Sequence, residues 1–122
     1  RLGEHKAPRY VTWSPENRSQ LIRIPAAKGE YERIELRSPD PAGNPYLAFA
    51  LILAAGADGI RRGLKAPPPT NVNLFTADQT ITGKLKQLPR TRAEAARIAK
   101  DSAFVREVLP EGIVEAYTVN AK

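Results

Sequence analysis

The chain contains no cysteine, no methionine and a single histidine among its 122 residues. Without cysteine it cannot form a disulfide, a thiolate metal site or a cysteine nucleophile. Because His5 is the one histidine, any bound metal must depend mainly on oxygen ligands, and zinc chemistry is not expected. The sequence also lacks a glycine-rich phosphate loop, and none of its serines has a histidine base in a matching order, so serine hydrolase chemistry is excluded.

Long hydrophobic runs are also absent. The longest apolar run, Tyr46 to Ala57, is followed by Asp58 and is too short for a transmembrane helix. It lies too far inside the chain for a signal peptide. We therefore expect a cytoplasmic protein that has no membrane partner. The chain opens at Arg1 rather than at methionine, which favours a piece of a longer protein.

Positive charge is in excess, with 19 lysines and arginines against 13 acidic residues and a formal net charge of +6. Such a balance suits phosphorylated ligands, acidic small molecules or nucleic acid. No motif for reading a groove or a single strand accompanies the charge, so nucleic acid is not an expected partner.

Three short strands are predicted in the first third of the chain. The β-branched and aromatic run 10–13 favours the first strand, and residues 21–24, ended by Pro25, form the second. Polar and apolar residues alternate strictly over 33–37, which predicts a half-buried third strand.

A long helix follows, because Asn44 is a good N-cap and Pro45 suits the first helical position. The predicted helix, residues 45–62, is apolar on all sides, which favours burial on most of its surface. We expect an α+β fold in which a small antiparallel sheet packs on this buried helix and a helical C-terminal tail follows.

The remainder of the chain divides at residue 90. Residues 65–90 contain Pro67 to Pro69 and are typical of an extended linker. Thr91 and Glu94 form a capping box that opens a helix over 92–100, with further helices predicted over 103–109 and 111–119. The expected organisation is residues 1–64 with the strands and buried helix, 65–90 as linker, and 91–122 as helical tail.

The third strand carries the most informative charge pattern. Arg33, Glu35 and Arg37 project from one face, while Ile34 and Leu36 face the other way. Guanidinium groups bind phosphate oxygens, and a carboxylate between them can ligate Mg²⁺ or Mn²⁺ that bridges the same phosphates. The row is therefore a candidate site for a metal nucleotide. The alternative is a solvated strand face whose charges pair with one another.

Two further arginines, Arg18 and Arg23, flank the preceding strand. Together with Arg33 and Arg37 they concentrate four cations in a short stretch, as a pocket for a polyphosphate requires.

The order and spacing of several motifs resemble the end of the glutamine synthetase catalytic domain. The segments that carry the resemblance are Asn17–Ser19, Ile22–Pro25, Arg33–Pro41, Asn44–Ala50, Ala54–Gly56 and Asp58–Ile60. The likeness is close from Arg1 to about Ile60 and looser beyond.

The resemblance implies an enzyme that uses ATP and Mg²⁺ or Mn²⁺ to phosphorylate the side-chain carboxylate of glutamate, after which ammonia displaces phosphate to give glutamine. Phosphoryl transfer of this kind depends on cations placed against the phosphate oxygens. The resemblance implies that Glu35 is a metal ligand and that Arg18, Arg23 and Arg33 contact the nucleotide. It implies that Arg18 and Arg37 are catalytic contacts to the transferring phosphoryl group and the glutamyl end. Arg1 and Arg37 would contact the substrate.

Two positions depart from the pattern of the main bacterial members. Lys6 stands where they carry a glutamate that closes the site and helps to deprotonate ammonium, and the loop is one residue shorter. This favours substitution by Glu4 or another residue, a different amine acceptor of the polyamine type, or loss of activity. Phe75 falls where some members carry a modifiable tyrosine, so nucleotidylation there is not expected.

The resemblance also implies that most metal ligands lie upstream of Arg1 and that a neighbouring subunit of a homo-oligomeric ring completes each site. The isolated chain is therefore expected to be inactive and prone to self-association. The alternative from a different class is a non-catalytic interaction module in which Arg33, Glu35 and Arg37 only pair with one another.

Overall fold

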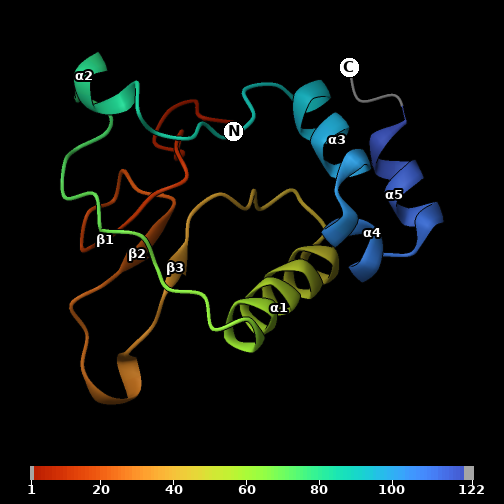
Figure 1. Cartoon of the computed structure of the whole chain (residues 1–122), viewed down its shortest axis with the longest axis horizontal. Helices are drawn as coiled ribbons and strands as arrows, with labels where there is room; N and C mark the ends of the chain where they lie inside the picture. Colours follow the sequence, from red (N-terminus) through yellow and green to blue (C-terminus); the bar gives the residue numbers. More distant parts are fainter. Residues whose placement is uncertain (1, 120–122) are drawn as a thin grey trace. The chain divides into compact units, whose positions relative to one another are not determined.

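The computed structural model describes residues 2–119 of the chain. The chain forms two compact units. Unit 1 consists of residues 1–39 and 67–90, and unit 2 consists of residues 40–66 and 91–122. Figure 1 follows the chain through the short strands of unit 1 and the helices of unit 2. The predicted α+β class is confirmed.

Unit 1 contains a three-stranded sheet in the order β1-β2-β3. Its strands are β1 (Trp13–Pro15), β2 (Ile22–Ile24) and β3 (Glu35–Leu36). Strands β2 and β3 are antiparallel, whereas β1 and β2 are parallel, so the expectation of a wholly antiparallel sheet is wrong for the first pair.

The parallel pairing arises from the connection between β1 and β2. The amide of Ile22 donates to the carbonyl oxygen of Thr12 at 3.1 Å, and the amide of Glu16 donates to that of Ile24 at 3.0 Å. The start of β2 therefore lies beside the start of β1, because the intervening loop carries the chain back before β2 begins. Tyr10, predicted to open the first strand, instead forms an isolated bridge with Gln87.

Residues 67–90 lie alongside the strands of unit 1. The indole of Trp13 donates to the carbonyl oxygen of Pro67 at 2.6 Å, and the amide of Thr70 donates to that of Trp13 at 2.9 Å. Further along, the amide of Val11 donates to the carbonyl oxygen of Lys86 at 2.8 Å. The segment that we expected as a linker is thus tied to the strands by backbone and side-chain hydrogen bonds.

The helices begin close to the residues that their capping patterns predict. They are α1 (Pro45–Arg61), α2 (Gln79–Thr82), α3 (Arg92–Asp101), α4 (Ala103–Val108) and α5 (Glu111–Thr118), with a 3-10 turn at Gly29–Tyr31. The side chain of Asn44 accepts hydrogen bonds from the amides of Tyr46 and Leu47. Thr91 accepts from the amide of Glu94, as the capping box requires. Of the helices described, α2 has no counterpart in the sequence-based expectation.

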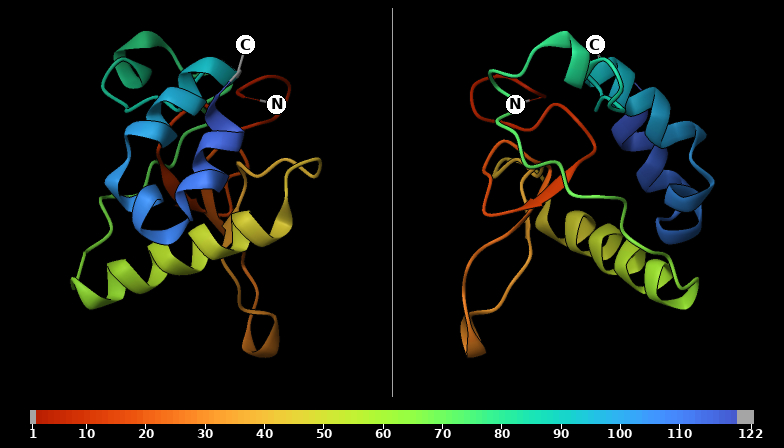
Figure 2. Two further views of the ribbon diagram at one scale, coloured as in Figure 1. Left: turned by 90° about the vertical axis from the view of Figure 1, so that its right-hand side faces the viewer. Right: turned by 60° about the vertical axis from the view of Figure 1, so that its left-hand side comes forward.

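Unit 2 brings α1 against α4 and α3 against α5, and the pairing of α3 with α5 is visible in both views of Figure 2. Helix α1 has no buried residue, and Tyr46, Leu53 and Ile60 are 84%, 72% and 84% exposed. The expected burial of this helix is therefore not met within the described residues. The remaining helices are too short to cover all of its apolar sides.

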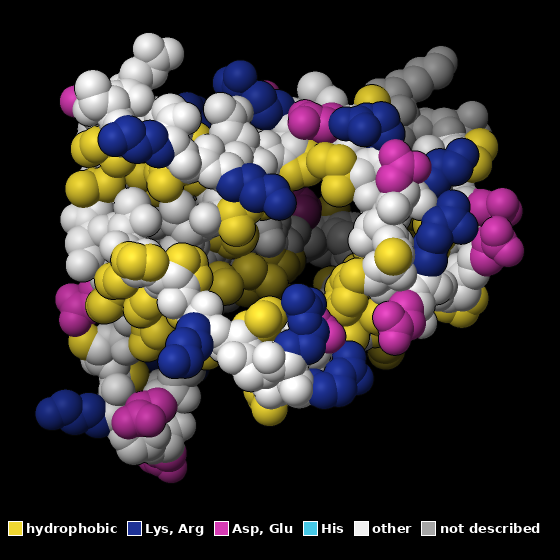
Figure 3. All heavy atoms as spheres, in the orientation of Figure 1, with side chains coloured by type: hydrophobic (Ala, Val, Ile, Leu, Met, Phe, Trp, Pro, Cys, Tyr) yellow, Lys and Arg dark blue, Asp and Glu magenta, His cyan; other side chains and the backbone are white. Residues whose placement is uncertain are grey.

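Few apolar side chains are buried in residues 2–119. They are Ala7, Pro8, Pro25, Leu74 and Val114, whereas the buried polar side chains are Thr12, Ser14, Ser19, Gln20 and Thr82. On the face drawn in Figure 3, hydrophobic side chains lie exposed among lysines and arginines. Across the described part of the chain, none of the helices combines the length and apolar character needed to span a bilayer.

Candidate functional site

A cross-strand pair of opposite charges lies at the centre of the sheet. Arg23 of β2 stands opposite Glu35 of β3 in the antiparallel register. Its Nη1 lies 2.8 Å from Glu35 Oε2, and its Nε donates to the carbonyl oxygen of Glu16 at 2.7 Å. Directly opposite side chains in an antiparallel pair are close enough to interact, so the register itself creates this contact.

Arg33 completes the cluster from the residues just before β3, because the strand predicted over 33–37 is limited to Glu35–Leu36. Its Nη2 lies 3.1 Å from Glu35 Oε1, so each carboxylate oxygen accepts one guanidinium N–H. Arg33 and Glu35 thus share a face, as the alternation predicts. The side chain of Arg23 is only 13% exposed, whereas that of Arg33 is 53% exposed. We refer to Arg23, Arg33 and Glu35 as the arginine–glutamate cluster.

The cluster keeps Glu35 ionised. The hydrogen bond from Arg23 is the largest influence on the pKa of Glu35 and holds it below its ordinary value, with Arg33 acting in the same direction. Partial desolvation acts against this by raising the pKa of the same carboxyl. Because the guanidinium groups outweigh desolvation, Glu35 is a carboxylate at neutral pH and retains lone pairs that a cation can use.

Arg37 leaves the row and turns to the first residues of the chain. Its Nη2 donates to the carbonyl oxygen of Lys6 at 3.4 Å, and its amide donates to the carbonyl oxygen of Leu21 at 2.9 Å. The segment 2–7 that it meets is sharply turned, with positive φ at Leu2 and His5, where glycine is normally favoured. Arg37 therefore links the end of β3 to this turned segment.

Arg18 lies exposed in the loop between β1 and β2. The residues on either side of it are not exposed in the same way, since Ser19 is 3% exposed and Asn17 is partly buried. Asn17 and Ser19 also bond to each other, because the Ser19 hydroxyl donates to Asn17 Oδ1 at 2.8 Å. A charged side chain thus projects from a backbone whose neighbouring side chains are anchored.

The arginine–glutamate cluster offers one carboxylate, Glu35, that could hold a divalent metal. Within residues 2–119 there is no group of three or more acidic or histidine side chains that could enclose a metal ion. Mg²⁺, however, is commonly held by one or two protein carboxylates together with substrate phosphates and water. Glu35 fits that role, since its oxygens are ionised and its side chain is 31% exposed. The adjacent guanidinium groups favour phosphate at the same place.

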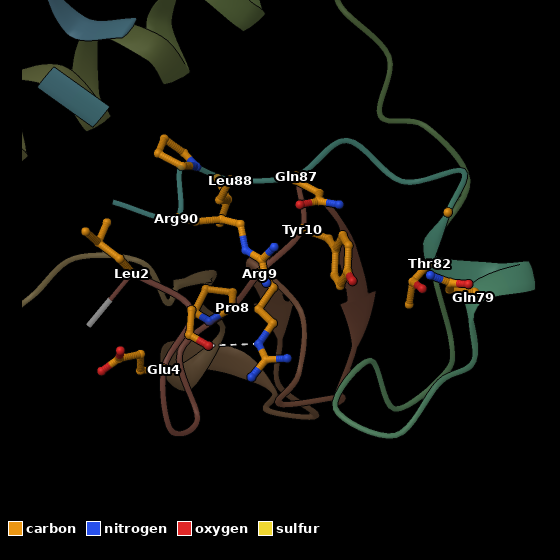
Figure 4. Close-up of a pocket in the computed structure, with 13 residues that line it drawn as sticks. Leu2, Glu4, Pro8, Arg9, Tyr10, Gln79, Thr82, Gln87, Leu88 and Arg90 are labelled. Carbon is orange, nitrogen blue, oxygen red and sulfur yellow. Dashed lines mark hydrogen bonds between the residues drawn. The ribbon is translucent and has the colours of Figure 1, made fainter. Parts of the chain in front are cut away.

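A separate pocket of about 450 Å³ lies in unit 1, away from the arginine–glutamate cluster. Figure 4 shows its wall formed by Leu2 and Glu4 on one side and by Gln79 and Thr82 on the other. Arg9 crosses it and donates from Nε to the carbonyl oxygen of Gly3 at 2.8 Å. The described residues that line this pocket include none of those that the sequence assigned to the site.

The structure brings together some of the predicted site residues and not others. Arg23, Arg33 and Glu35 are in contact, Arg37 and Arg18 lie elsewhere in unit 1, and Arg1 is outside the described residues. The backbone carbonyl groups of Glu16 and Lys6, which accept hydrogen bonds from Arg23 and Arg37, could not be predicted from the sequence. The polar neighbours of Arg18 were also missed, although Asn17 and Ser19 belong to a segment that carried the resemblance.

Comparisons with known proteins agree along the whole chain. The family model described as "Glutamine synthetase, catalytic domain" matches residues 1–122. The chain is 49% identical over 115 residues to a glutamine synthetase of Methanosarcina mazei, covering 93% of this chain and 26% of the relative. It is 45% identical over 111 residues to that of Thermus thermophilus, covering 89% of this chain and 25% of the relative.

Solved structures give the same result for the fold. A chain described as "GmaS/ADP complex-Conformation 1" superposes with a TM-score of 0.75 at 29% identity, covering 92% of this chain and 24% of that one. The chain therefore spans about a quarter of the length of the relatives that it matches.

Proposed function

Because the chain belongs to the glutamine synthetase catalytic-domain family, we propose that its parent protein joins ammonia to glutamate at the expense of ATP. The chain contributes the nucleotide-phosphate end of the site. The observation that carries this proposal is the arginine–glutamate cluster, in which an ionised carboxylate lies between two guanidinium groups. Phosphoryl transfer requires cations of this kind on the phosphate oxygens more than it requires a protein nucleophile.

The reaction divides into two displacements. A side-chain carboxylate oxygen of glutamate attacks the γ-phosphorus of ATP, and ADP leaves, giving a γ-glutamyl phosphate. The nitrogen of ammonia then attacks the acyl carbon, phosphate leaves, and the excess proton passes to a base. In the intact site a divalent cation, Mg²⁺ or Mn²⁺, would neutralise the negative charge of the phosphates during transfer of the phosphoryl group.

Each candidate site residue has a proposed role in this reaction. Glu35 holds the cation, and Arg23 and Arg33 bind the nucleotide phosphates while keeping that carboxylate oriented. Arg18, exposed in its loop, reaches the nucleotide and the transferring phosphoryl group. Arg37 serves the phosphoryl group and the glutamyl end from its position beside Lys6. Arg1 is proposed to hold the substrate carboxylate.

The ligand set offered by residues 2–119 is incomplete. We propose that the missing metal ligands belong to the rest of the parent protein and that sites are completed between subunits of a homo-oligomeric ring. The isolated chain is then inactive. The arginines around its one carboxylate repel a free cation, so the carboxylate holds the cation only when phosphates are present.

The experiment is an assay of the full-length parent for glutamine formation. Glutamine should form only when glutamate, ATP, ammonia and Mg²⁺ or Mn²⁺ are all present, and ADP and phosphate should appear in equal amounts. Omission of each component in turn is the control. A full-length parent that binds no nucleotide and forms no amide would instead support a non-catalytic interaction module.

Lys6 favours a second candidate, a ligase that joins glutamate to an amine other than ammonia, of the polyamine type. Its side chain is exposed on the turned segment that Arg37 contacts. A lysine there has the same sign of charge as ammonium and repels it, and it lacks the carboxylate that accepts the ammonium proton in the main bacterial pattern. Competition separates the two candidates, because polyamines should suppress glutamine formation and be consumed if they are the true acceptors. A Lys6→Glu variant should then gain activity toward ammonia.

A further inference from the structure

A buried polar network surrounds the backbone of Arg18. Ser19 is 3% exposed and Gln20 is fully buried, yet both carry polar side chains in a unit that buries few apolar ones. Arg18 itself is exposed. An exposed cation thus lies between buried polar neighbours. Buried polar groups stabilise a fold only when they are hydrogen-bonded, so the partners of these side chains matter.

The partners of this network come from a segment more than fifty residues later in the sequence. The carbonyl oxygen of Val72 accepts from Asn17 Nδ2 at 2.9 Å and from Gln20 Nε2 at 3.0 Å. The Ser19 hydroxyl oxygen accepts from the amide of Leu74 at 2.9 Å. The loop that carries Arg18 is thereby fastened on both sides of the arginine to residues 72–74.

Fastening of this kind restricts the backbone of Arg18 without occupying its guanidinium. Buried hydrogen bonds to backbone groups restrict the residues that make them, and here they come from Asn17, Ser19 and the Gln20 amide nitrogen, whereas Gln20 Oε1 has no hydrogen-bond partner. A side chain that projects from a fixed backbone loses less entropy when it engages a ligand than one on a mobile loop. The network thus has the properties needed to present a cation to a phosphoryl group.

We propose that Ser19 and Gln20, acting with the backbone groups of Val72 and Leu74, are positioning residues that hold Arg18 for its contact with the transferring phosphoryl group. This inference rests on the proposed function, and in particular on the role of Arg18. Ser19 and Gln20 do not touch the substrate, so their effect on the reaction passes through the arginine.

A double-mutant cycle in the full-length parent tests the proposal. Arg18→Ala should lower kcat by about 10²- to 10³-fold, as loss of one transition-state donor does. Ser19→Ala should lower kcat by about 10- to 100-fold with little change in the KM for ATP, because misplacing a catalytic group affects the chemical step. The double variant should resemble Arg18→Ala alone, since Ser19 has no arginine left to position.

Asn73→Ala is the matched control, because Asn73 lies in the same segment but bonds locally, accepting from the amide of Phe75 at 3.0 Å. It should leave kcat unchanged. Gln20→Met removes a donor to Val72 at nearly constant volume and should show the same dependence on Arg18 with a smaller loss. This variant decides the question if Ser19→Ala does not fold.

A purely structural role gives a different pattern. Ser19→Ala and Gln20→Met would then lower the melting temperature but leave kcat per folded enzyme unchanged, or lower it by the same factor with and without Arg18. Either result overturns the positioning role while leaving glutamine formation by the unsubstituted parent intact. If the unsubstituted parent neither binds ATP nor forms glutamine, the proposed function is wrong, and the positioning role falls with it.

Discussion

The two units of the chain are stabilised in different ways. In unit 1 the buried side chains include the polar Ser19 and Gln20, which bond to the backbone amide of Leu74 and the backbone carbonyl of Val72. In unit 2 the helices begin at local caps and meet through apolar side chains, while large apolar groups of α1 stay exposed. Specific hydrogen bonds hold the charged residues in place in unit 1, whereas unit 2 presents apolar surface that requires cover.

The apolar surface of unit 2 includes a groove of about 190 Å³ between its helices. Leu47 and Leu51 of α1 line it together with Val105, Leu109 and Val114. Because relatives are about four times as long as this chain, the cover is expected from other parts of the parent protein. We therefore propose that unit 1 carries the chemistry and that unit 2 packs against the remaining protein.

The largest expected effect comes from a substitution within the arginine–glutamate cluster. Arg23→Ala in the full-length parent removes the bonds to Glu35 and to the Glu16 carbonyl, and kcat/KM should fall by about 10²- to 10³-fold. Arg62→Ala is the matched control in unit 2, where Arg62 pairs with Asp58 at an exposed site. Steady-state assays measure kcat/KM for both variants. An equal loss of kcat/KM in both would contradict the proposal that only unit 1 carries the chemistry.

The exposed face of α1 should control self-association of the isolated chain. Leu53→Lys replaces a side chain that is 72% exposed and should shift the chain from oligomers toward monomers, because it interrupts exposed apolar surface. Ile34→Lys, at a position 70% exposed in unit 1, is the comparison variant and should have little effect. Sedimentation velocity measures both, and a monomeric unsubstituted chain would count against the need for cover.

A smaller effect is expected at the N-cap of α1. Asn44→Ala removes the acceptor for the amides of Tyr46 and Leu47 and should destabilise the helix by about 1 kcal/mol. Thermal unfolding followed by circular dichroism should show lower helicity and an earlier transition. Asn73→Ala, which removes a comparable local bond in unit 1, should leave the helical signal unchanged, and a similar loss of helicity in both variants would contradict the account.

The smallest effect is the pH dependence of the Glu35 ion pair, since the pair is partly exposed. The folded state lowers the pKa of Glu35 below that of the unfolded chain. Its stabilisation is therefore complete above the ordinary glutamate value of about 4.3 and is lost as the pH falls through the lower folded pKa. An NMR titration of the Glu35 carboxyl in the unsubstituted chain and in Arg33→Ala should show a higher pKa in the variant.

Local sequence signals predicted the helices well because their causes are local. Asn44, Thr91 and Ser102 each accept a hydrogen bond from an amide two or three residues ahead, and such spacing can be read directly from the sequence. The burial of α1 was a different matter. It depends on which surfaces surround the helix, and those of residues 2–119 leave α1 without a buried residue.

The strand register and the positioning contacts were harder to predict because they join distant residues. Alternation correctly placed Arg33 beside Glu35, but it could not show that Arg23 stands opposite Glu35 across the sheet. It also gave no indication that the Val72 carbonyl would fasten the loop of Arg18. The functional assignments themselves came from the resemblance, since charge spacing alone allowed a self-paired strand face.

The most direct test of the central claim is calorimetric measurement of ATP binding by the full-length parent with and without Mg²⁺. We expect the unsubstituted protein to bind ATP only when the metal is present. This binding should be lost in Glu35→Ala and retained in Arg62→Ala. Binding of equal strength in the unsubstituted protein and in Glu35→Ala, or binding indifferent to the metal, would contradict the assignment of Glu35 to a metal–nucleotide site.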